Sequence, residues 1–334
     1  GNMNKYMIAL ILTIILWFSL SCDITEVAED CNIVELVEQD SISVDCRTSI
    51  QDLLYPSENN LSNNIVKMGL GEIEGKPLLF FTGSNESGSP LILDSSDIII
   101  IGTQNDEKDT LDIADYEMKN FKDISGTIIS LSSIIDYSGS MLNSDIDDAV
   151  EIYTDIFGVF NPVFESEIRL FSDTVYQKID FNSDYNLLLS KISRDNTIER
   201  KSTSLYDAIG GGLSALSNRN GLIKLLLVAT DGRENSSETF TSKSQIYNLS
   251  KQQNIPVIIL GSLFADLDFM RELAEETNGY YIYNKAFLNL KSDVIGLIQI
   301  LTNIQAIEIT GEDWTNATSF QVTIDGKTLV FNLD

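Results

Sequence analysis

Oxygen-bearing side chains follow an apolar run near the middle of the chain. The run is followed by Asp-Tyr-Ser-Gly-Ser at positions 136–140. Because side chains alternate between the two faces of an extended strand, Asp136, Ser138 and Ser140 can point the same way where the strand ends. Carboxylate and hydroxyl oxygens suit hard cations such as Mg²⁺, Mn²⁺ or Ca²⁺ rather than soft-ligand metals. The pattern therefore indicates a cation-binding loop.

Two later segments carry matching chemistry. Thr203 precedes an amphipathic helical pattern, and Asp231-Gly232 ends the apolar run 222–230. Each motif also has an ordinary structural explanation, since Asp136 and Thr203 could cap helices and Asp231-Gly232 could form a turn. Three such motifs in this order favour one shared site over three separate coincidences.

In these motifs the chain resembles the von Willebrand factor type A (VWA) family over roughly residues 126–304. That family has a metal-ion-dependent adhesion site built from Asp-x-Ser-x-Ser, a distant Thr and a distant Asp. The resemblance implies that Ser138, Ser140 and Thr203 hold the cation directly, and that Asp136 and Asp231 contact it directly or through waters. It also implies a further ligand, a carboxylate from a partner protein.

The expected cofactor is Mg²⁺, with Mn²⁺ or Ca²⁺ as alternatives. A site that is only structural, or that has kept the motif without binding metal, is the other interpretation.

The central region alternates strand-like and helix-like patterns, which predicts an α/β fold. The expected strands are 128–135, 167–171, 175–179, 222–230, 256–260 and 280–283, with 167–171 and 175–179 as a hairpin. The expected helices are 145–157, 205–217, 242–253, 267–277 and 288–304. This order predicts a Rossmann-like, doubly wound, mostly parallel sheet with helices on both faces. Asp136 and Asp231 then lie at carboxyl ends of strands, where such sheets form their binding crevice.

The flanks of this region read as β-structure. Apolar segments at 77–82, 91–93 and 98–101 favour strands, and Asp325-Gly326 between two further apolar segments favours a hairpin. We expect residues 63–125 and 305–334 to form one smaller, sandwich-like domain into which the VWA domain, 126–304, is inserted. Two unrelated β units are the alternative.

The N-terminus resembles an export signal. Lys5 precedes an apolar stretch, residues 7–20, that is shorter than the roughly 20 residues of a spanning helix. Ser21-Cys22 resembles the lipobox of bacterial lipoproteins, although Leu20 stands one place later than usual. The resemblance implies a signal peptide over 1–21 and lipidation of Cys22; cleavage without lipidation and an uncleaved anchor are alternatives.

The resulting expectation is a lipoprotein anchored to a bacterial membrane and facing the periplasm or the cell surface, with residues 22–62 as an acidic stalk. If Cys22 carries lipid, Cys31 and Cys46 remain as a pair, and disulfides persist in exported proteins. Such a bond would stabilise the folded chain by about 3 kcal/mol through loop entropy. Two unpaired thiols are the alternative.

Composition limits the function. The 334 residues include 22 Lys and Arg against 50 Asp and Glu, a net charge of −28 that disfavours nucleic acid and anionic lipid headgroups as partners. The chain has no His, which excludes Ser-His-Asp and Cys-His hydrolases and His-ligated zinc.

We therefore expect a non-enzymatic envelope lipoprotein that binds a partner protein through a divalent cation. A structural or assembly subunit of an envelope complex is the main alternative, and an enzyme using carboxylates or metal-bound water is a more distant one.

Overall fold

The computed structural model describes residues 58–61, 64–124, 129–262, 264–284, 287–314 and 316–333. All of them belong to one unit that begins at Tyr55. The signal peptide, the lipidation site Cys22 and the Cys31–Cys46 disulfide lie outside these residues and stay predictions. In the described part of the chain, no helix combines the length and apolar character needed to cross a bilayer.

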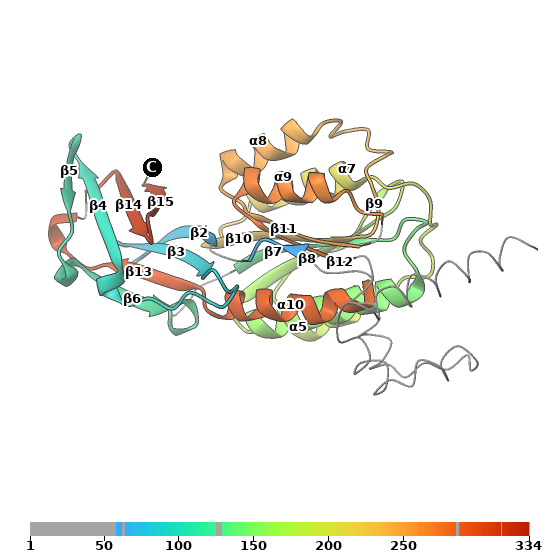
Figure 1. The fold of residues 1–334 in the computed structure, drawn as a ribbon, viewed down its shortest axis with the longest axis horizontal. Coiled ribbons are helices and arrows are strands. Elements are labelled where there is room, and N and C mark those ends of the chain that lie inside the picture. Colours follow the sequence, from blue (N-terminus) through green and yellow to red (C-terminus); the bar gives the residue numbers. More distant parts are fainter. Residues whose placement is uncertain are drawn as a thin grey trace, which may run out of the picture. The chain divides into compact units, whose positions relative to one another are not determined.

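The centre of the chain forms a twisted, mostly parallel sheet, as predicted (Figure 1). Its strands are β7 (Ile129–Asp136), β8 (Phe164–Phe171), β9 (Val175–Asn182), β10 (Ile223–Thr230), β11 (Val257–Ser262) and β12 (Tyr280–Asn284). The spatial order is β12-β11-β10-β7-β8-β9, and only β9 is antiparallel to its neighbour. Going along the chain, β8 is added on one side of β7 and β10 to β12 on the other. The order therefore reverses between β7 and β10, where open α/β sheets place their binding crevice.

Helices cover both faces of this sheet (Figure 1). One face packs against α5 (Asn143–Phe160), α6 (Tyr185–Ile192) and α10 (Phe287–Thr302). The other face packs against α7 (Leu205–Ser217), α8 (Lys243–Gln253) and α9 (Leu267–Thr277). The predicted helices are all present, while the short α6, which begins after the capping residue Asp184, was not predicted.

A glycine brings α7 close to the sheet. A Cβ on Gly212 would lie 2.6 Å from Ser132 Oγ and 2.9 Å from Ile134 Cδ1, both on β7. On the opposite face, the buried Tyr153 hydroxyl of α5 lies 2.6 Å from the Ile134 carbonyl and 2.9 Å from the Leu227 carbonyl. The two helices thus fix β7 and β10 from both sides.

The flanks supply two groups of antiparallel strands. The central sheet continues from β10 through β2 (Asn64–Ile73), β3 (Lys76–Ser84), β13 (Gln305–Ile309) and β6 (Tyr116–Asn120). A separate sheet has the order β15-β14-β4-β5, formed by β4 (Ile98–Gln104), β5 (Glu107–Thr110), β14 (Ser319–Ile324) and β15 (Lys327–Asn332). Strands from before and after the central region therefore pair with each other: β13 lies between β3 and β6, and β14 pairs with β4.

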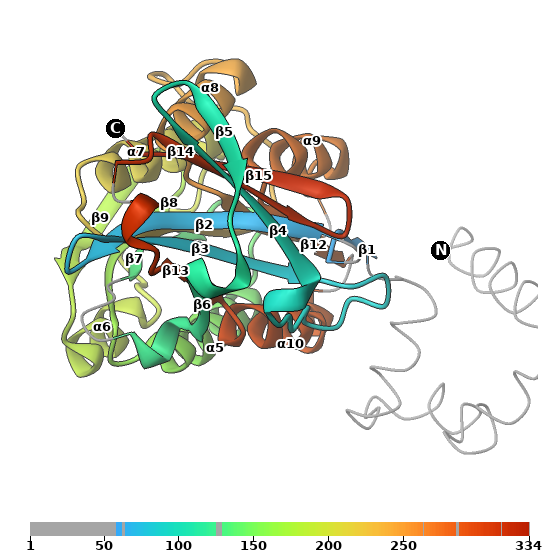
Figure 2. The same ribbon diagram turned by 90° about the vertical axis from the view of Figure 1, so that its left-hand side faces the viewer.

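The second sheet packs over β2 and β3 (Figure 2). The strand β3 alternates between two cores: Leu79 and Phe81 face the second sheet, while Leu78 and Phe80 belong to the core under α5 and α10. This alternation follows from the two-residue period of a strand that is buried on both faces. The flanking layer is therefore continuous with the central core.

The remaining elements are short. They are β1 (Glu58–Asn59), which pairs with β12, and the 3₁₀ turns η1 (Ser95–Asp97), η2 (Ile113–Asp115), η3 (Phe121–Asp123) and η4 (Glu312–Trp314). The strand predicted at 91–93 is wrong. Its neighbour Pro90 makes one isolated bridge to Ser84, and the Ile92 side chain is 73% exposed, so this apolar segment has no partner strand. The exact domain limits stay predictions.

Among the described residues, the flanking strand β2 pairs with the central strand β10 at one position. Gly69 of β2 pairs with Ile223, the first residue of β10, beside a register shift between Lys67 and Gly69. A Cβ on Gly69 would lie 1.8 Å from the Leu222 carbonyl oxygen, so only glycine allows this approach.

We therefore expect Gly69→Ala to lower the free energy of unfolding by about 1–3 kcal/mol, since the backbones must move apart. Urea denaturation followed by circular dichroism measures this change. The matched control is Gly158→Ala in α5, whose added Cβ would lie 3.9 Å from the nearest atom, Tyr185 Oη. The control should be neutral or slightly stabilising, because alanine is the better helix former. Equal stability of the two variants would contradict this account of the junction.

Candidate metal site

The switch point of the sheet brings two carboxylates together. Asp136 is the last residue of β7, and Asp231 directly follows β10. The strands are parallel neighbours in a register that pairs Ile135 with Ala229, so both strands end at the same edge of the sheet. Both aspartates are buried, with Asp136 fully shielded and Asp231 only 2% exposed.

The loop after β7 places two hydroxyls beside these carboxylates. Asp136 Oδ1 accepts the backbone N–H of Ser138 at 2.6 Å, which closes the turn, and its Oδ2 accepts the Thr230 hydroxyl. Ser138 Oγ lies 3.1 Å from Ser140 Oγ, and Ser140 Oγ donates to Asp231 Oδ1 at 2.6 Å. Two carboxylates and two hydroxyls thus form one continuous cluster.

Thr203 joins the cluster from the loop before α7. A Cβ on Gly232 would lie 2.9 Å from Thr203 Oγ1 and 3.4 Å from Asp136 Oδ2, so both oxygens border the space that this glycine leaves open. All five predicted residues therefore meet at one place. They adjoin an open cleft of about 500 Å³ lined by Ser140, Thr203, Gly232, Arg233, Asn235 and Phe264.

The electrostatics of the cluster favour a bound cation. Burial raises the pKa of Asp136 to about 6. Burial also raises the pKa of Asp231 to about 7; the Ser140 hydrogen bond opposes this rise, and the negative charges of Asp136 and Asp145 add to it. Two ionised carboxylates in one buried site repel each other and lose hydration. A divalent cation between them would offset both costs.

The donor set fits a hard cation. The five side chains offer only oxygen, from two carboxylates and three hydroxyls, which suits Mg²⁺ or Mn²⁺ better than thiolate-seeking metals. No group of three or more His, Cys, Asp and Glu side chains is placed to hold a metal within the described ranges. A cation here would therefore rely on hydroxyls and keep positions for water or for an outside ligand. Metal binding by these residues stays a prediction.

The chain matches one protein family. Residues 131–295 match the family profile described as von Willebrand factor type A domain. This part of the chain is a VWA domain. Curated protein sequences give no match.

Three solved structures illustrate the similarity in fold. The first is proximal thread matrix protein 1 of the mussel byssus, in a form with a zinc-occupied adhesion motif (17% identity, 58% of this chain, 50% of that chain, TM-score 0.46). The second is an aerotolerance-related membrane protein of Bacteroides fragilis (18% identity, 53% of this chain, 98% of that chain, TM-score 0.42). The third is the PilB minor pilin of Streptococcus sanguinis (13% identity, 74% of this chain, 79% of that chain, TM-score 0.43). The match thus spans half of the mussel protein.

Within the VWA domain, Asn235 fixes the loop that carries Thr203. Asn235 Oδ1 accepts the Thr203 N–H at 2.8 Å, and the Asn235 N–H donates to the Thr203 carbonyl at 3.0 Å. This reciprocal pair was not predicted from the sequence. The only signal was the polar run after Asp231, which is rich in residues that bond to backbone.

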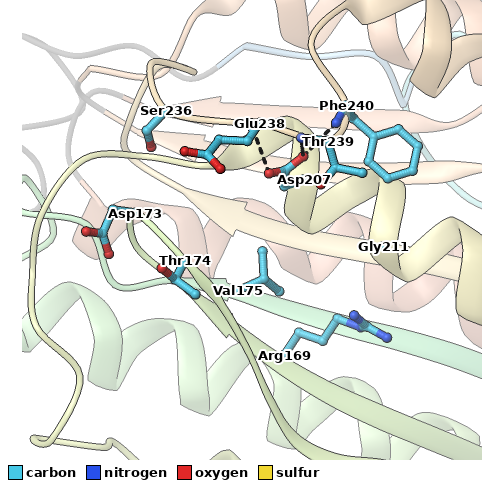
Figure 3. A pocket seen from close by; sticks show the side chains of 10 residues that line it. All are labelled: Arg169, Asp173, Thr174, Val175, Asp207, Gly211, Ser236, Glu238, Thr239 and Phe240. Atoms are coloured by element: carbon cyan, nitrogen blue, oxygen red, sulfur yellow. Dashed lines mark hydrogen bonds between the residues drawn. The ribbon is translucent and has the colours of Figure 1, made fainter.

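The same loop caps α7. Ser204, the N-cap residue, makes no side-chain cap; instead Glu234 accepts the Tyr206 N–H at 2.8 Å and Ser237 Oγ accepts the Asp207 N–H at 2.9 Å. Asp207 in turn accepts the backbone N–H groups of residues 238–240 (Figure 3). These bonds satisfy amides that a helix start leaves unpaired. They also join the loop after β10 to the loop before α7 through several hydrogen bonds.

Arg200 holds the loop that follows Ser140. Its guanidinium donates to the Met141 carbonyl at 2.9 Å and to the Asn143 side chain, and the Gly139 N–H donates to the Lys201 carbonyl at 2.8 Å. The acidic residues at the start of α5 have structural partners: Asp145 accepts the Leu142 N–H, and Asp147 pairs with Arg194. These contacts give both side chains a structural role at the start of the helix.

A second cleft of about 360 Å³ lies beside α7 and has Arg169 and Asp207 in its lining (Figure 3). Arg169 pairs with the fully buried Glu167 through two bonds of 2.8 Å. Asp207 is also occupied, because it accepts the backbone N–H groups of residues 238–240. These charged groups therefore stabilise the fold, and we assign this cleft no ligand.

In chelator, we expect the melting temperature to rise as the pH is lowered from about 8 to about 5. Burial raises the pKa values of Asp136 and Asp231 above those of the unfolded chain, so the folded state takes up protons more readily. The two ionised carboxylates therefore destabilise the folded state above their folded pKa values, and this destabilisation is lost as the pH falls through those values. Scanning calorimetry in EDTA measures the melting temperature at each pH.

Asp136→Asn is the comparison for this measurement, because it removes one of the two titrating groups. The variant should show a weaker dependence of melting temperature on pH than the wild type. Parallel curves for the two proteins would show that Asp136 does not titrate in this range.

For the metal-loaded domain, we expect Asn235→Ala to weaken Mg²⁺ or Mn²⁺ affinity by roughly 10–100-fold, the usual effect of losing a residue that orients a ligand. Isothermal titration calorimetry measures the affinity. Asn220→Ala is the control, since Asn220 is also exposed but lies just before β10, at the end of the strand away from the site. A normal affinity in Asn235→Ala would mean that Thr203 is held without this pair.

Proposed function

We propose that this protein is an envelope lipoprotein whose VWA domain binds a partner protein through a divalent cation, with Mg²⁺ as the first choice. The observation that carries the proposal is the meeting of Asp136, Ser138, Ser140, Thr203 and Asp231 at the switch point of the sheet, beside an open cleft. A site designed only for stability would not need to open into a cleft.

The roles of the residues follow from their positions. Ser140 and Thr203 line the cleft, so their hydroxyls would hold the cation from the open side. Ser138, Asp136 and Asp231 are buried, so the Ser138 hydroxyl and the two negative charges would act from the inner side. When bound, the cation supplies an electrophilic centre that a partner's carboxylate can complete. Hydroxyl ligands are neutral, so they leave more of the ion's positive charge for that carboxylate than further carboxylates would.

The attachment of the flanks leaves this surface accessible. The flanking strands join the central sheet at Ile223, the first residue of β10, whereas the site follows Thr230, its last residue. At roughly 3.3 Å per residue, the join and the site are about 23 Å apart along this strand. We infer that a partner can reach the cleft without meeting the β-rich layer. Lipidation at Cys22 would hold the protein on a membrane facing the periplasm or the cell surface.

The test is metal binding by the full chain, wild type beside Asp136→Ala. We expect the wild type to bind Mg²⁺ and Mn²⁺ in calorimetry and the variant to lose this binding, while its circular dichroism spectrum remains that of a folded protein. The control is Asp268→Ala, whose side chain is 93% exposed on α9.

Unchanged metal binding in Asp136→Ala would contradict the site. Absence of binding in the wild type would favour the alternative, a structural or assembly subunit of an envelope complex that has kept the motif without the cation.

A further inference from the structure

Two arginines in the described part of the chain lack a carboxylate partner, and both flank the metal site. The chain carries 50 acidic residues against 22 basic ones, so acidic partners are abundant. The other described arginines each form an ion pair; they are Arg169, Arg194, Arg219 and Arg271. The exceptions are Arg200, which holds the loop after Ser140, and Arg233, which lines the cleft.

Arg233 keeps its terminal nitrogens available. Its Nε donates to the Phe264 carbonyl at 3.2 Å, which orients the side chain, and the described residues provide no partner for the rest of the guanidinium. An arginine fork held in this way can bind a carboxylate through two parallel hydrogen bonds. Arg200, in contrast, uses both terminal nitrogens on Met141 and Asn143.

Phe264 adds an apolar wall to the same cleft. Its side chain is 54% exposed, and it shares the lining of the cleft with Ser140 and Thr203. A single exposed apolar side chain needs no explanation by itself. Here, however, an exposed aromatic ring and an unpaired arginine lie next to each other and border the metal site, an arrangement typical of the anchor residues of interfaces.

We propose that Arg233 and Phe264 form a selectivity surface that admits an acidic protein segment with two acidic groups and an apolar side chain. This inference rests on the proposed function: one carboxylate of the segment completes the cation site, the second pairs with Arg233, and the apolar side chain packs on Phe264. The surface thereby distinguishes such a segment from one that offers a single carboxylate.

Charge complementarity supports this occupant. With a net charge of −28, the protein repels acidic partners at long range, so an acidic segment needs local positive charge to bind. The cation and Arg233 supply that charge within one cleft. A basic segment would instead meet the unpaired guanidinium, and a purely apolar one would leave it unsatisfied.

The test uses defined peptides and the full chain in detergent. Fluorescent Gly/Ser peptides carry one Asp, one Asp with a second Asp at varied spacing, one Asp with a Leu, or all three. Fluorescence polarisation in Mg²⁺ and in EDTA measures their binding, and calorimetry measures Mg²⁺ binding separately. We expect at least one peptide with all three side chains to bind about tenfold more tightly than the single-Asp peptide, a free-energy gain of about 1.4 kcal/mol.

The variants assign each part of the gain. Arg233→Ala should remove the preference for the second Asp, and Phe264→Ala the preference for Leu, with Mg²⁺ affinity unchanged in both. The matched controls are Arg271→Ala, which removes an exposed, ion-paired arginine, and Ile295→Ala, which removes an apolar side chain that is also 54% exposed. Both controls should keep the full preference.

The outcomes separate this inference from the proposed function. Equal binding of single- and double-acid peptides, a preference that survives in Arg233→Ala, or no peptide binding to a protein that binds Mg²⁺ would overturn the selectivity surface alone. Selective, Arg233-dependent binding that persists in EDTA, with no Mg²⁺ binding, would support the surface and overturn the cation mechanism.

Discussion

The burial of two carboxylates at the ends of neighbouring parallel strands is the constraint on which the rest of the site depends. Asp136 and Asp231 are brought together because β7 and β10 pair in parallel at the point where the strand order reverses. Like charges in a buried site are unfavourable unless something of opposite charge joins them. The fold thus builds a position that favours a cation, and the hydroxyls of the surrounding loops complete it.

The loops around this position are held by one another rather than by their own local structure. Asn235 fixes the backbone of Thr203, Glu234 caps the first turn of α7, and Arg200 holds the loop after Ser140. Because each loop satisfies the backbone groups of the next, a displacement of one would leave amides unpaired in another. Loops held in this way would lower the ordering cost of binding a cation or a partner.

The flanking strands extend the central sheet at the other end of β10. Gly69 allows β2 to approach the start of that strand. One face of the neighbouring strand β3 packs in the central core, and the other packs against the second sheet. This arrangement attaches the flanking strands at the end of β10 that lies away from the cleft. The cleft keeps an exposed aromatic ring and an arginine beside the candidate metal site, where selectivity for a partner can be set.

Most element types, and the five candidate site residues that the fold brings together, could be predicted from the sequence. The 3.6-residue period gave α7 and α9 their observed limits, and Asp-x-Ser-x-Ser and Asp-Gly marked two of the loops. Three features depend on the folded chain: the apolar segment 91–93 finds no partner strand, β2 joins β10, and Arg233 meets Phe264. Local periodicity fixes which residues form an element, because neighbours along the chain set it. Contacts between residues tens of positions apart depend on strand order and close backbone approach, which no local pattern encodes.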